Sequence, residues 1–362
     1  MTRPLDPAER IARLRLARTG RVGPVAFVEL LRREGSALQA LDRLPELTRR
    51  AGATTRMVPI QEIEAELALG EAIGARLLVL GDPDYPAPLA VLDAPAPVLW
   101  TRGNVELLAR DAIALVGARV ASAAGQRFAQ GLAVEVGGAG FVVVSGLARG
   151  IDAAAHLGSV ATGTVAVLGG GVDDVYPPQN AELYDRLVAE GCVVSESPVG
   201  HRAQARDFPR RNRIISGLAR AVVVVEAEMR SGSLITARLA AEQGREVLAV
   251  PGSPLDPRCA GSNDLIRQGA GLCAGLDDIL RALERPRGLF EPSPTWRRDD
   301  EDGPPPSDLA ERVMALLGPT PISRDDLIRA VGAPAGQVMG VLLELTLSGQ
   351  ATLTEDGRVI RL

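Results

Sequence analysis

The chain has 362 residues, 46% of them hydrophobic and 23% charged, which is enough for two or three folded domains with a sizeable core. Its net charge is −5 and all 40 basic residues are arginine, so attraction to a polyanion would have to come from local arginine clusters. No apolar run reaches the ~18 residues needed to span a bilayer, and the N-terminal MTRPLDPAER holds no signal-peptide core, so we expect a cytoplasmic protein without a membrane segment.

Cysteine and histidine are scarce in this chain. Cys192, Cys259 and Cys273 form no CxxC pair, and His156 and His201 are the two histidines. This pattern argues against a disulfide framework, a zinc site or a histidine-rich metal centre. We therefore expect neither a metal nor another cofactor.

Residues 1–70 are predicted to form an N-terminal helical domain. Apolar side chains recur there at roughly helical spacing, at Ile11, Leu14, Leu16, Phe27, Leu30, Leu31, Leu38 and Leu41. The stretch Thr19–Pro24 contains two glycines and separates two of these helices. It is compatible with a helix–hairpin–helix, which can seat a DNA backbone, and also with a plain helical-bundle connection, which is the commoner case.

Residues 71–110 are predicted to connect this domain to the next one. They contain a short apolar strand at Leu77–Leu80, proline-rich coil, and a second candidate strand at Val98–Trp100. The segment is too apolar for a free linker, so we expect it to pack on the following domain.

Residues 111–285 are predicted to form an α/β domain. Helical stretches separate most of its continuous apolar runs, which lie at Ile113–Val116, Phe141–Val144, Val165–Leu168, Val193–Ser195, Ala221–Val225 and Val247–Val250. Continuous rather than alternating hydrophobicity indicates strands buried on both faces. The predicted fold is a Rossmann-like, doubly wound, mostly parallel sheet, and such sheets bind ligands beyond the carboxyl ends of their strands.

The C-terminal part divides into a linker and a small domain. Residues 286–306 are rich in proline and charge, which is typical of a linker. Residues 307–362 show three helical segments followed by a hairpin, the order of a winged-helix-like domain. We expect this domain to move as a separate unit.

The stretch Phe141–Asp152, FVVVSGLARGID, predicts a strand, a tight turn and a helix start. Such a turn can aim backbone N–H groups and the positive end of a helix dipole at an anion. Gly146 and Gly150 would let a ligand approach the backbone, and Arg149 could grip a phosphate. A tight turn with a surface arginine explains the same residues equally well.

Other loops at the strand ends add to this pattern. Almost every predicted strand runs into a loop that contains glycine or serine, among them Gly117–Arg119, Gly169–Pro177 and Ser231–Ser233. Six such loops on one edge of a sheet favour an extended polyanion or nucleotide site. The chain has no GxxxxGK[ST] and no GxGxxG fingerprint, and no residue is predicted to be catalytic.

The stretch His201–Arg213, HRAQARDFPRRNR, carries five arginines against a single acidic residue, Asp207. An exposed Phe208 among arginines would combine a stacking face with phosphate clamps, as single-stranded nucleic-acid sites do. The alternative is a solvated basic face with Phe208 packed in the core.

Six ordered motifs identify a resemblance. These are SGLARGID (145–152), GGGVDDVYPPQN (169–180), SESP (195–198), FPRRNRIISGLA (208–219), VVVVEAEMRSGSLITARLA (222–240) and REVLAVPG (245–252). In this order they resemble the DNA-processing protein A (DprA/Smf) family over the whole predicted α/β domain. The flanking units are similar to those of longer members, with an N-terminal domain of SAM or helix–hairpin–helix type and a C-terminal winged helix.

The resemblance implies a function and partners. It implies a non-catalytic homodimer, paired through the Rossmann-like domain, that binds single-stranded DNA, protects incoming strands and loads the recombinase RecA in natural transformation. It also implies a binding site, here made of Arg119, Ser145, Gly146, Arg149, Gly150, Phe208, Arg211 and Arg213. Asn212 and the loop residues Ser231, Gly232 and Ser233 belong to the predicted site as well. Family sites often use a lysine, and Arg206 or Arg210 would stand in its place. We expect Arg149 and Arg211 to be removable without unfolding the protein.

Two other functions stay open at this point. The fold is similar to that of the LOG nucleotide phosphoribohydrolases, but Ser231–Ala237 lacks the glutamate of their PGGxGTxxE motif. A sequence-specific DNA-binding regulator would need a basic recognition helix, and Pro334–Leu347 contains no arginine.

Overall fold

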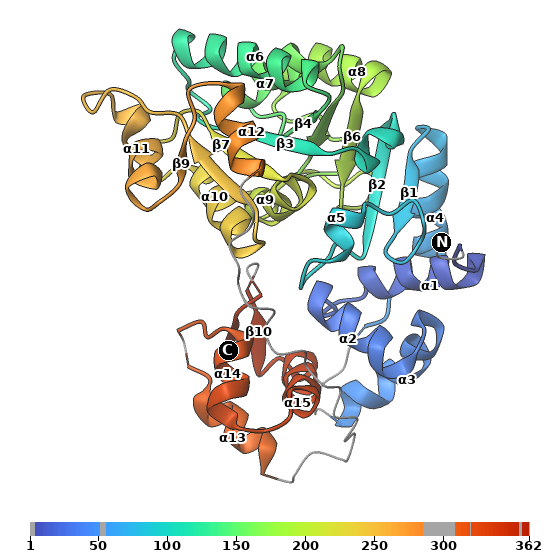
Figure 1. Cartoon of the computed structure of the whole chain (residues 1–362). Coiled ribbons are helices and arrows are strands. Elements are labelled where there is room, and N and C mark those ends of the chain that lie inside the picture. Colours follow the sequence, from blue (N-terminus) through green and yellow to red (C-terminus); the bar gives the residue numbers. More distant parts are fainter. Residues whose placement is uncertain (1–3, 51–55, 285–307, 319, 355–356, 362) are drawn as a thin grey trace.

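The computed structural model describes residues 4–50, 56–284, 308–318, 320–354 and 357–361. The middle of the chain forms an α/β domain. The N-terminal helices lie on one side of it, and a small C-terminal unit lies below both (Figure 1). The predicted linker 286–306 lies outside the described residues.

Four helices form the N-terminal unit: α1 (Pro7–Arg18), α2 (Pro24–Glu34), α3 (Ala37–Arg50) and α4 (Ile60–Ala72). The side chain of Asp6 accepts a hydrogen bond from the amide of Ala8 and caps α1, while proline opens both α1 and α2. Arg21, in the hairpin between them, has a φ of 67°. Phe27 and Leu30 are fully buried in the core that α1, α2 and α3 share.

The described residues form one nine-stranded sheet in the order β1-β2-β6-β5-β4-β3-β7-β8-β9. The strands are β1 (Arg76–Val79), β2 (Val98–Gly103), β3 (Ala112–Val116), β4 (Val142–Ser145), β5 (Thr164–Val167), β6 (Cys192–Ser195), β7 (Ala221–Val224), β8 (Glu246–Ala249) and β9 (Gly271–Leu272). The neighbours in the run β6-β5-β4-β3-β7-β8-β9 pair in parallel. Strand β2 pairs antiparallel with β6, and β1 pairs antiparallel with β2 at the edge of the sheet. The mostly parallel, doubly wound sheet expected from the sequence is therefore confirmed.

Two layers of helices cover the sheet (Figure 1). The helices are α5 (Ala87–Ala90), α6 (Ala123–Gly138), α7 (Ile151–Ser159), α8 (Ala181–Glu190), α9 (Asp207–Leu218), α10 (Gly232–Glu242), α11 (Ala260–Arg267) and α12 (Leu276–Glu284). Helices α6, α7, α8 and α12 pack on one face, while α5, α9, α10 and α11 pack on the other. Ile113 and Val143 point to the first face and Ala114 and Val144 to the second, so every central strand is buried on both sides.

The N-terminal helices are fastened to the antiparallel edge of the sheet through Trp100. Its indole Nε1 donates to Glu66 on α4 over 2.7 Å, and Glu66 also pairs with Arg18 of α1 over 2.7 Å. A Cβ on Gly70 would overlap the Trp100 ring, so the glycine in α4 allows this close approach. Residues 71–110 are thus more than a connection, since they add two strands to the sheet.

The C-terminal unit has helices α13 (Leu309–Leu316), α14 (Arg324–Val331) and α15 (Ala335–Ser348), then strands β10 (Ala351–Leu353) and β11 (Val359–Arg361). This is the winged-helix order predicted from the sequence. Within the described residues, no single helix is both long and apolar enough to cross a membrane. The pair α14 and α15 passes that test only when taken together across a 115° bend.

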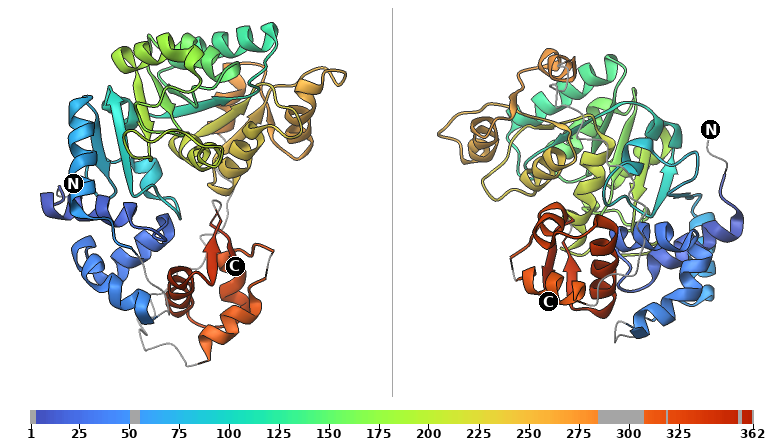
Figure 2. Two further views of the ribbon diagram at one scale, coloured as in Figure 1. Left: turned by 180° about the vertical axis from the view of Figure 1, so that it is seen from behind. Right: turned by 60° about the horizontal axis from the view of Figure 1, so that its bottom comes forward.

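The C-terminal unit does not stand apart from the rest of the protein, contrary to expectation. Leu343 and Leu347 of α15 are buried in the core of the N-terminal helices, and the two units lie side by side in the right view of Figure 2. Arg21 donates to the carbonyl oxygen of Leu347 over 3.1 Å. Two looser ion pairs reach the α/β domain, Arg324–Asp93 at 3.3 Å and Arg358–Glu242 at 3.7 Å.

Candidate nucleic-acid interface

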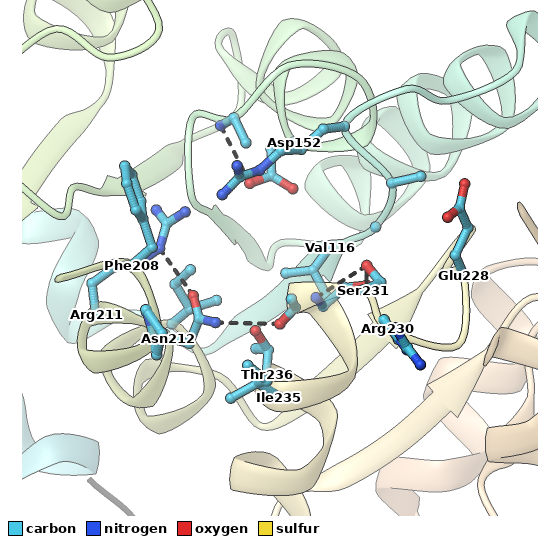
Figure 3. Close-up of a pocket in the computed structure, with 18 of the residues that line it drawn as sticks. Val116, Asp152, Phe208, Arg211, Asn212, Glu228, Arg230, Ser231, Ile235 and Thr236 are labelled. Atoms are coloured by element: carbon cyan, nitrogen blue, oxygen red, sulfur yellow. Dashed lines mark hydrogen bonds between the residues drawn. The ribbon is translucent and has the colours of Figure 1, made fainter. Parts of the chain in front are cut away.

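A cleft opens where the winding direction of the sheet reverses. Strands β3 and β7 are neighbours, and the chain proceeds from β3 toward β6 on one side and from β7 toward β9 on the other. The segments that follow these two strands, together with α9, line a cavity of about 720 Å³ (Figure 3). Such reversal points are the usual ligand sites of doubly wound sheets, so the structure places the candidate site where the fold predicts it.

The N-terminus of α10 forms one wall of this cleft, hereafter the first cleft. Ser231 caps the helix, and its hydroxyl accepts a hydrogen bond from the amide of Ser233 at 3.3 Å. Asn212 on α9 donates to the carbonyl oxygen of Gly232 at 3.3 Å and ties the two helices together. The first turn of α10 contains no acidic residue to offset its positive dipole end. This end lines the cleft beside the exposed Arg230 and Glu228.

Phe208 forms the opposite wall. Its ring is half-buried and lies 5.4 Å from the ring of Tyr176, tilted by 45°. The guanidinium carbons of Arg119 and Arg211 lie 5.4 and 6.0 Å from its centroid. An aromatic face beside two guanidinium groups is suited to stacking a base and holding its phosphates.

Arg211 is buried beneath this wall and anchored to the sheet. It donates to the carbonyl oxygens of Gly146, at 2.6 Å, and Val167, and its Nε donates to Asn212 over 3.0 Å. Burial lowers the pKa of Arg211 to about 10, with Asp152 opposing the shift and Arg119 adding to it. The group therefore stays charged at neutral pH and carries a positive charge into the floor of the cleft.

The turn after β4 serves this anchor rather than a ligand. A Cβ on Gly146 would overlap the Arg211 guanidinium, so the space that the glycine leaves is already filled. The amides of Gly146 and Ala148 donate to Asp152, at 3.1 and 3.3 Å, and are not free for an external anion. Burial raises the pKa of Asp152 against the opposing charge of Arg211. These contacts favour the tight structural turn over the anion cradle.

Two more residues of the turn are structural. Ser145 is fully buried and donates to the carbonyl oxygen of Leu115 at 2.6 Å. Gly150 has a φ of 75°, and a Cβ there would overlap the carbonyl oxygen of Ala118. Arg149 is exposed and lies outside the lining of the first cleft.

The basic stretch before β7 is helical from Asp207, not a loop. Asp207 accepts hydrogen bonds from Gln204 N and pairs with His201, each over 2.8 Å, while Pro209 fits the first turn of a helix. On the far side of α9, Arg213 is buried and pairs with Glu196 over 2.6 Å.

Glu196 is the partner of two arginines. Although burial opposes ionisation, the guanidinium groups of Arg213 and Arg210 hold the pKa of Glu196 below its usual range. Arg210 reaches Glu196 over 3.0 Å, and Arg213 also donates to the carbonyl oxygen of Ala94 over 2.7 Å. Arg213 thus braces the domain, and Arg210 borders a different cavity from Arg211.

Comparison with known proteins follows the same domain pattern. The model of the family described as DNA recombination-mediator protein A matches residues 76–284, more than half of the chain. This chain belongs to that family. The family's models for a DprA-like N-terminal HHH domain and a DprA winged helix domain match residues 7–68 and 297–357, so the DprA/Smf resemblance is confirmed for all three units.

Named relatives and solved structures agree. The chain is 36% identical to Protein Smf of Escherichia coli over 324 residues, covering 86% of this chain and 84% of the relative. It is 44% identical to DNA processing protein DprA of Streptococcus pneumoniae over 210 residues, covering 56% and 72%. The X-ray structure of the pneumococcal protein superposes with a TM-score of 0.63 at 34% identity, covering 76% of this chain and 98% of that one.

The structure of DNA processing protein A from Helicobacter pylori, described for its single-stranded DNA binding mode, has a TM-score of 0.53. It is 25% identical and covers 58% of this chain and 95% of its own.

The residues carried over from the DprA motifs separate into two groups in the structure. The first cleft is lined by Arg119, Phe208, Arg211, Asn212, Ser231, Gly232 and Ser233. The residues that do not line it are Ser145, Gly146, Arg149, Gly150, Arg206, Arg210 and Arg213. The sequence analysis did not name Tyr176 and Arg230 as site residues, although Tyr176 lies in the loop Gly169–Pro177 and Arg230 directly precedes the loop Ser231–Ser233.

Glu226, His156 and Cys192 are buried within the described part of the chain. Glu226 accepts from the amide and hydroxyl of Ser122, at 2.9 and 2.5 Å, and so caps α6. Burial, reinforced by the charge of Arg211, lowers the pKa of His156 to about 3, and its Nδ1 lies 2.7 Å from Thr164. Burial raises the pKa of Cys192 to about 12. Across the described ranges, no three metal-ligating side chains cluster.

Proposed function

We propose that this member of the DprA family binds single-stranded DNA, with Phe208 and the α10 N-terminus of the first cleft as the main contacts. The observation that carries the proposal is the half-buried Phe208 ring, which has two guanidinium groups within 6.0 Å of its centroid and an aromatic neighbour. A base can stack there only when it is unpaired and turned out of a duplex, so the site favours single strands. The single-stranded DNA binding mode of the Helicobacter pylori relative supports this proposal.

The arrangement of the cleft also supports binding without sequence preference. Its cationic groups are arginines that hold phosphate, and stacking on Phe208 accepts any base because every base has a π-face. Groove reading through the C-terminal unit is not part of the proposal. Helix α15 holds the position of a recognition helix but buries Leu343 and Leu347 against the N-terminal helices.

The finer role is a proposal that family membership supports. We infer that the protein acts as a homodimer through its α/β domain, protects incoming strands, and passes them to RecA during natural transformation and recombination in the cytoplasm. We further propose that it turns over no substrate, because the chain lacks a Walker lysine and the glutamate of the LOG motif. Glu226, the carboxylate that follows β7, is engaged in capping α6. Base release from a nucleoside monophosphate that is lost in Glu226→Gln would contradict that part.

Binding is tested by fluorescence anisotropy on one labelled sequence, presented as a single strand and as a duplex over a range of salt concentrations. The single strand should bind more tightly, with a log–log salt slope of about −0.7 per phosphate contacted. Equal affinity for both forms would overturn the proposal. Sedimentation of the free protein tests the dimer, and RecA filament growth on strands coated with single-strand-binding protein tests loading.

A further inference from the structure

A second cavity, hereafter the second cleft, lies where the three units of the chain meet. It has a volume of about 800 Å³ and is bordered by the hairpin between α1 and α2, the start of α9, and the end of α15 with β10. Four arginines line it, namely Arg21, Arg206, Arg210 and Arg213. Within the described part of the chain, no acidic residue is among its lining residues.

The charge of the second cleft is only partly neutralised. Arg210 and Arg213 share one carboxylate, Glu196, and Arg21 spends one N–H on the carbonyl oxygen of Leu347. Arg206 is exposed and forms no ion pair with any described residue. Glu196 is shared by two of these guanidinium groups and Asp207 lies next to Arg206, so the four arginines leave a net positive charge in a concave site where field lines from like charges converge.

Helix α9 joins the two clefts. Phe208 faces the first cleft, whereas Arg206 and Arg210 border the second. Residues four apart share one side of a helix and a residue midway between them points to the other side. The first turn of α9 is therefore a ridge with a stacking face on one side and two cations on the other.

We propose that the second cleft binds the backbone phosphates of the same DNA strand where it leaves the first cleft. This inference rests on the proposed function. No aromatic residue lines the second cleft among the described residues, so the contact is to phosphate rather than to bases. The docked C-terminal unit supplies one side of this cleft. Its position on the N-terminal helices therefore determines the length of single strand that the protein can contact.

The experiment uses the full chain and two strand lengths. Single-strand sites commonly span about 4–16 nucleotides. One labelled strand is taken from the lower end of that range and reaches only the first cleft. The other is longer than the upper end and can cross α9 into the second cleft.

The variant to test is Arg21→Ala with Arg206→Ala, since both residues are exposed, and the change removes the hydrogen bond from Arg21 to the carbonyl oxygen of Leu347. The matched control is Arg127→Ala with Arg186→Ala, which removes two exposed arginines from α6 and α8 on the opposite face of the sheet. Both variants lose two positive charges. A difference in their affinity for DNA therefore depends on where the removed arginines lie.

The cleft variant should bind the short strand within about twofold of the parent and the long strand about tenfold or more weakly, as for two lost phosphate contacts. Its salt slope on the long strand should fall by up to about 1.4, since each lost contact removes about 0.7. The control pair should leave both strands unchanged. Equal weakening in the cleft variant and the control, or no weakening of the long strand, overturns the second cleft alone, whereas a parent protein that binds neither strand overturns the proposed function.

Discussion

The two clefts differ in how their arginines are held. In the first cleft, Arg211 is buried and its hydrogen bonds end on the carbonyls of Gly146 and Val167, in the parallel core of the sheet. The second also contains a buried arginine, Arg213, but its Arg21 and Arg206 are exposed, and one wall is a separate unit docked through Leu343 and Leu347. The first site is thus organised before a ligand arrives, and the second depends on how three units are assembled. A preorganised charge favours high affinity for DNA. In the second cleft, affinity can change with the docking of the C-terminal unit on the N-terminal helices.

The replacement Arg211→Ala should have the largest effect, because it acts on both binding and stability. It leaves the carbonyls of Gly146 and Val167 without this donor and removes a cation that interacts with buried Asp152, at a cost of about 3 kcal/mol in the free energy of unfolding. Strand affinity should drop at least about tenfold. Denaturant unfolding and anisotropy measure the two effects.

Arg149→Ala is the control for that prediction. Arg149 is exposed and outside the cleft lining, so its removal should leave the unfolding transition unchanged. From the sequence, both Arg149 and Arg211 were expected to be removable without unfolding the protein. An Arg211→Ala protein as stable as the parent would restore that expectation and refute the structural role.

Removing residues 285–362 should sharpen the contrast between the clefts. Leu343 and Leu347 share a buried core with the N-terminal helices, so their removal exposes apolar side chains of that core at a cost of about 25 cal/mol for each Å² uncovered. The melting temperature of the shortened protein should fall by several degrees. A short strand should still bind within about tenfold of the parent, because the first cleft is untouched, and complete loss of binding by a folded truncation would move the main site out of the α/β domain.

Phe208→Ala should weaken binding by about 1–3 kcal/mol while leaving the salt slope unchanged, because stacking is not screened by ions. Phe208→Tyr keeps the ring and serves as the control. A variant whose salt slope drops as much as its affinity would show that Phe208 acts by placing arginines rather than by stacking.

Raising the pH should affect the first cleft before any other part of the site. Burial brings the pKa of Arg211 down to about 10, so affinity for an oligo(dA) strand should be level from about pH 6 to 8 and should fall as the pH approaches 10. Arg211→Lys should move this fall to lower pH, because a lysine has an ordinary pKa of about 10.4 and burial lowers it further. A fall at the same pH in both proteins would assign it to another group.

Lowering the pH should have the smallest effect, a loss of the stability that the ion pairs of Glu196 with Arg210 and Arg213 on α9 contribute. The folded-state pKa of Glu196 lies below its usual value, so its ion pairs stabilise the protein above about pH 4.3 and are lost as the pH falls through the folded value. The melting temperature should therefore decline in acid, and less steeply in Glu196→Gln. Identical acid profiles for the two proteins would exclude Glu196 as the source.

The strands were predictable because each is a continuous apolar run, and burial on both faces of a parallel sheet demands that pattern. Strand β9 was missed, since Gly271–Leu272 is too short to form a run. The partners of Arg211 and Arg213 could not be read from local sequence either. Their acceptors lie far along the chain, at Gly146 and Glu196, and only the folded sheet brings these groups together.

The docking of the C-terminal unit was missed for a different reason. Helix α15 is apolar on several sides, so its pattern does not separate the residues that fill its own core from those that face the N-terminal helices. Val338 and Val341 take the first role, while Leu343 and Leu347 take the second. Sequence periodicity locates a buried helix but does not name its partner.

Gly146 controls a cleft that it does not line. Any larger side chain at this position would push the Arg211 guanidinium away from the carbonyl that holds it, and the displaced charge would move relative to the Phe208 ring. The strand that precedes Gly146 would keep its register, because β4 ends at Ser145. The size of the side chain at position 146 therefore determines where the Arg211 charge lies in the site. Replacing Gly146 by alanine and then by larger residues gives a way to change DNA affinity without altering any residue that touches the strand.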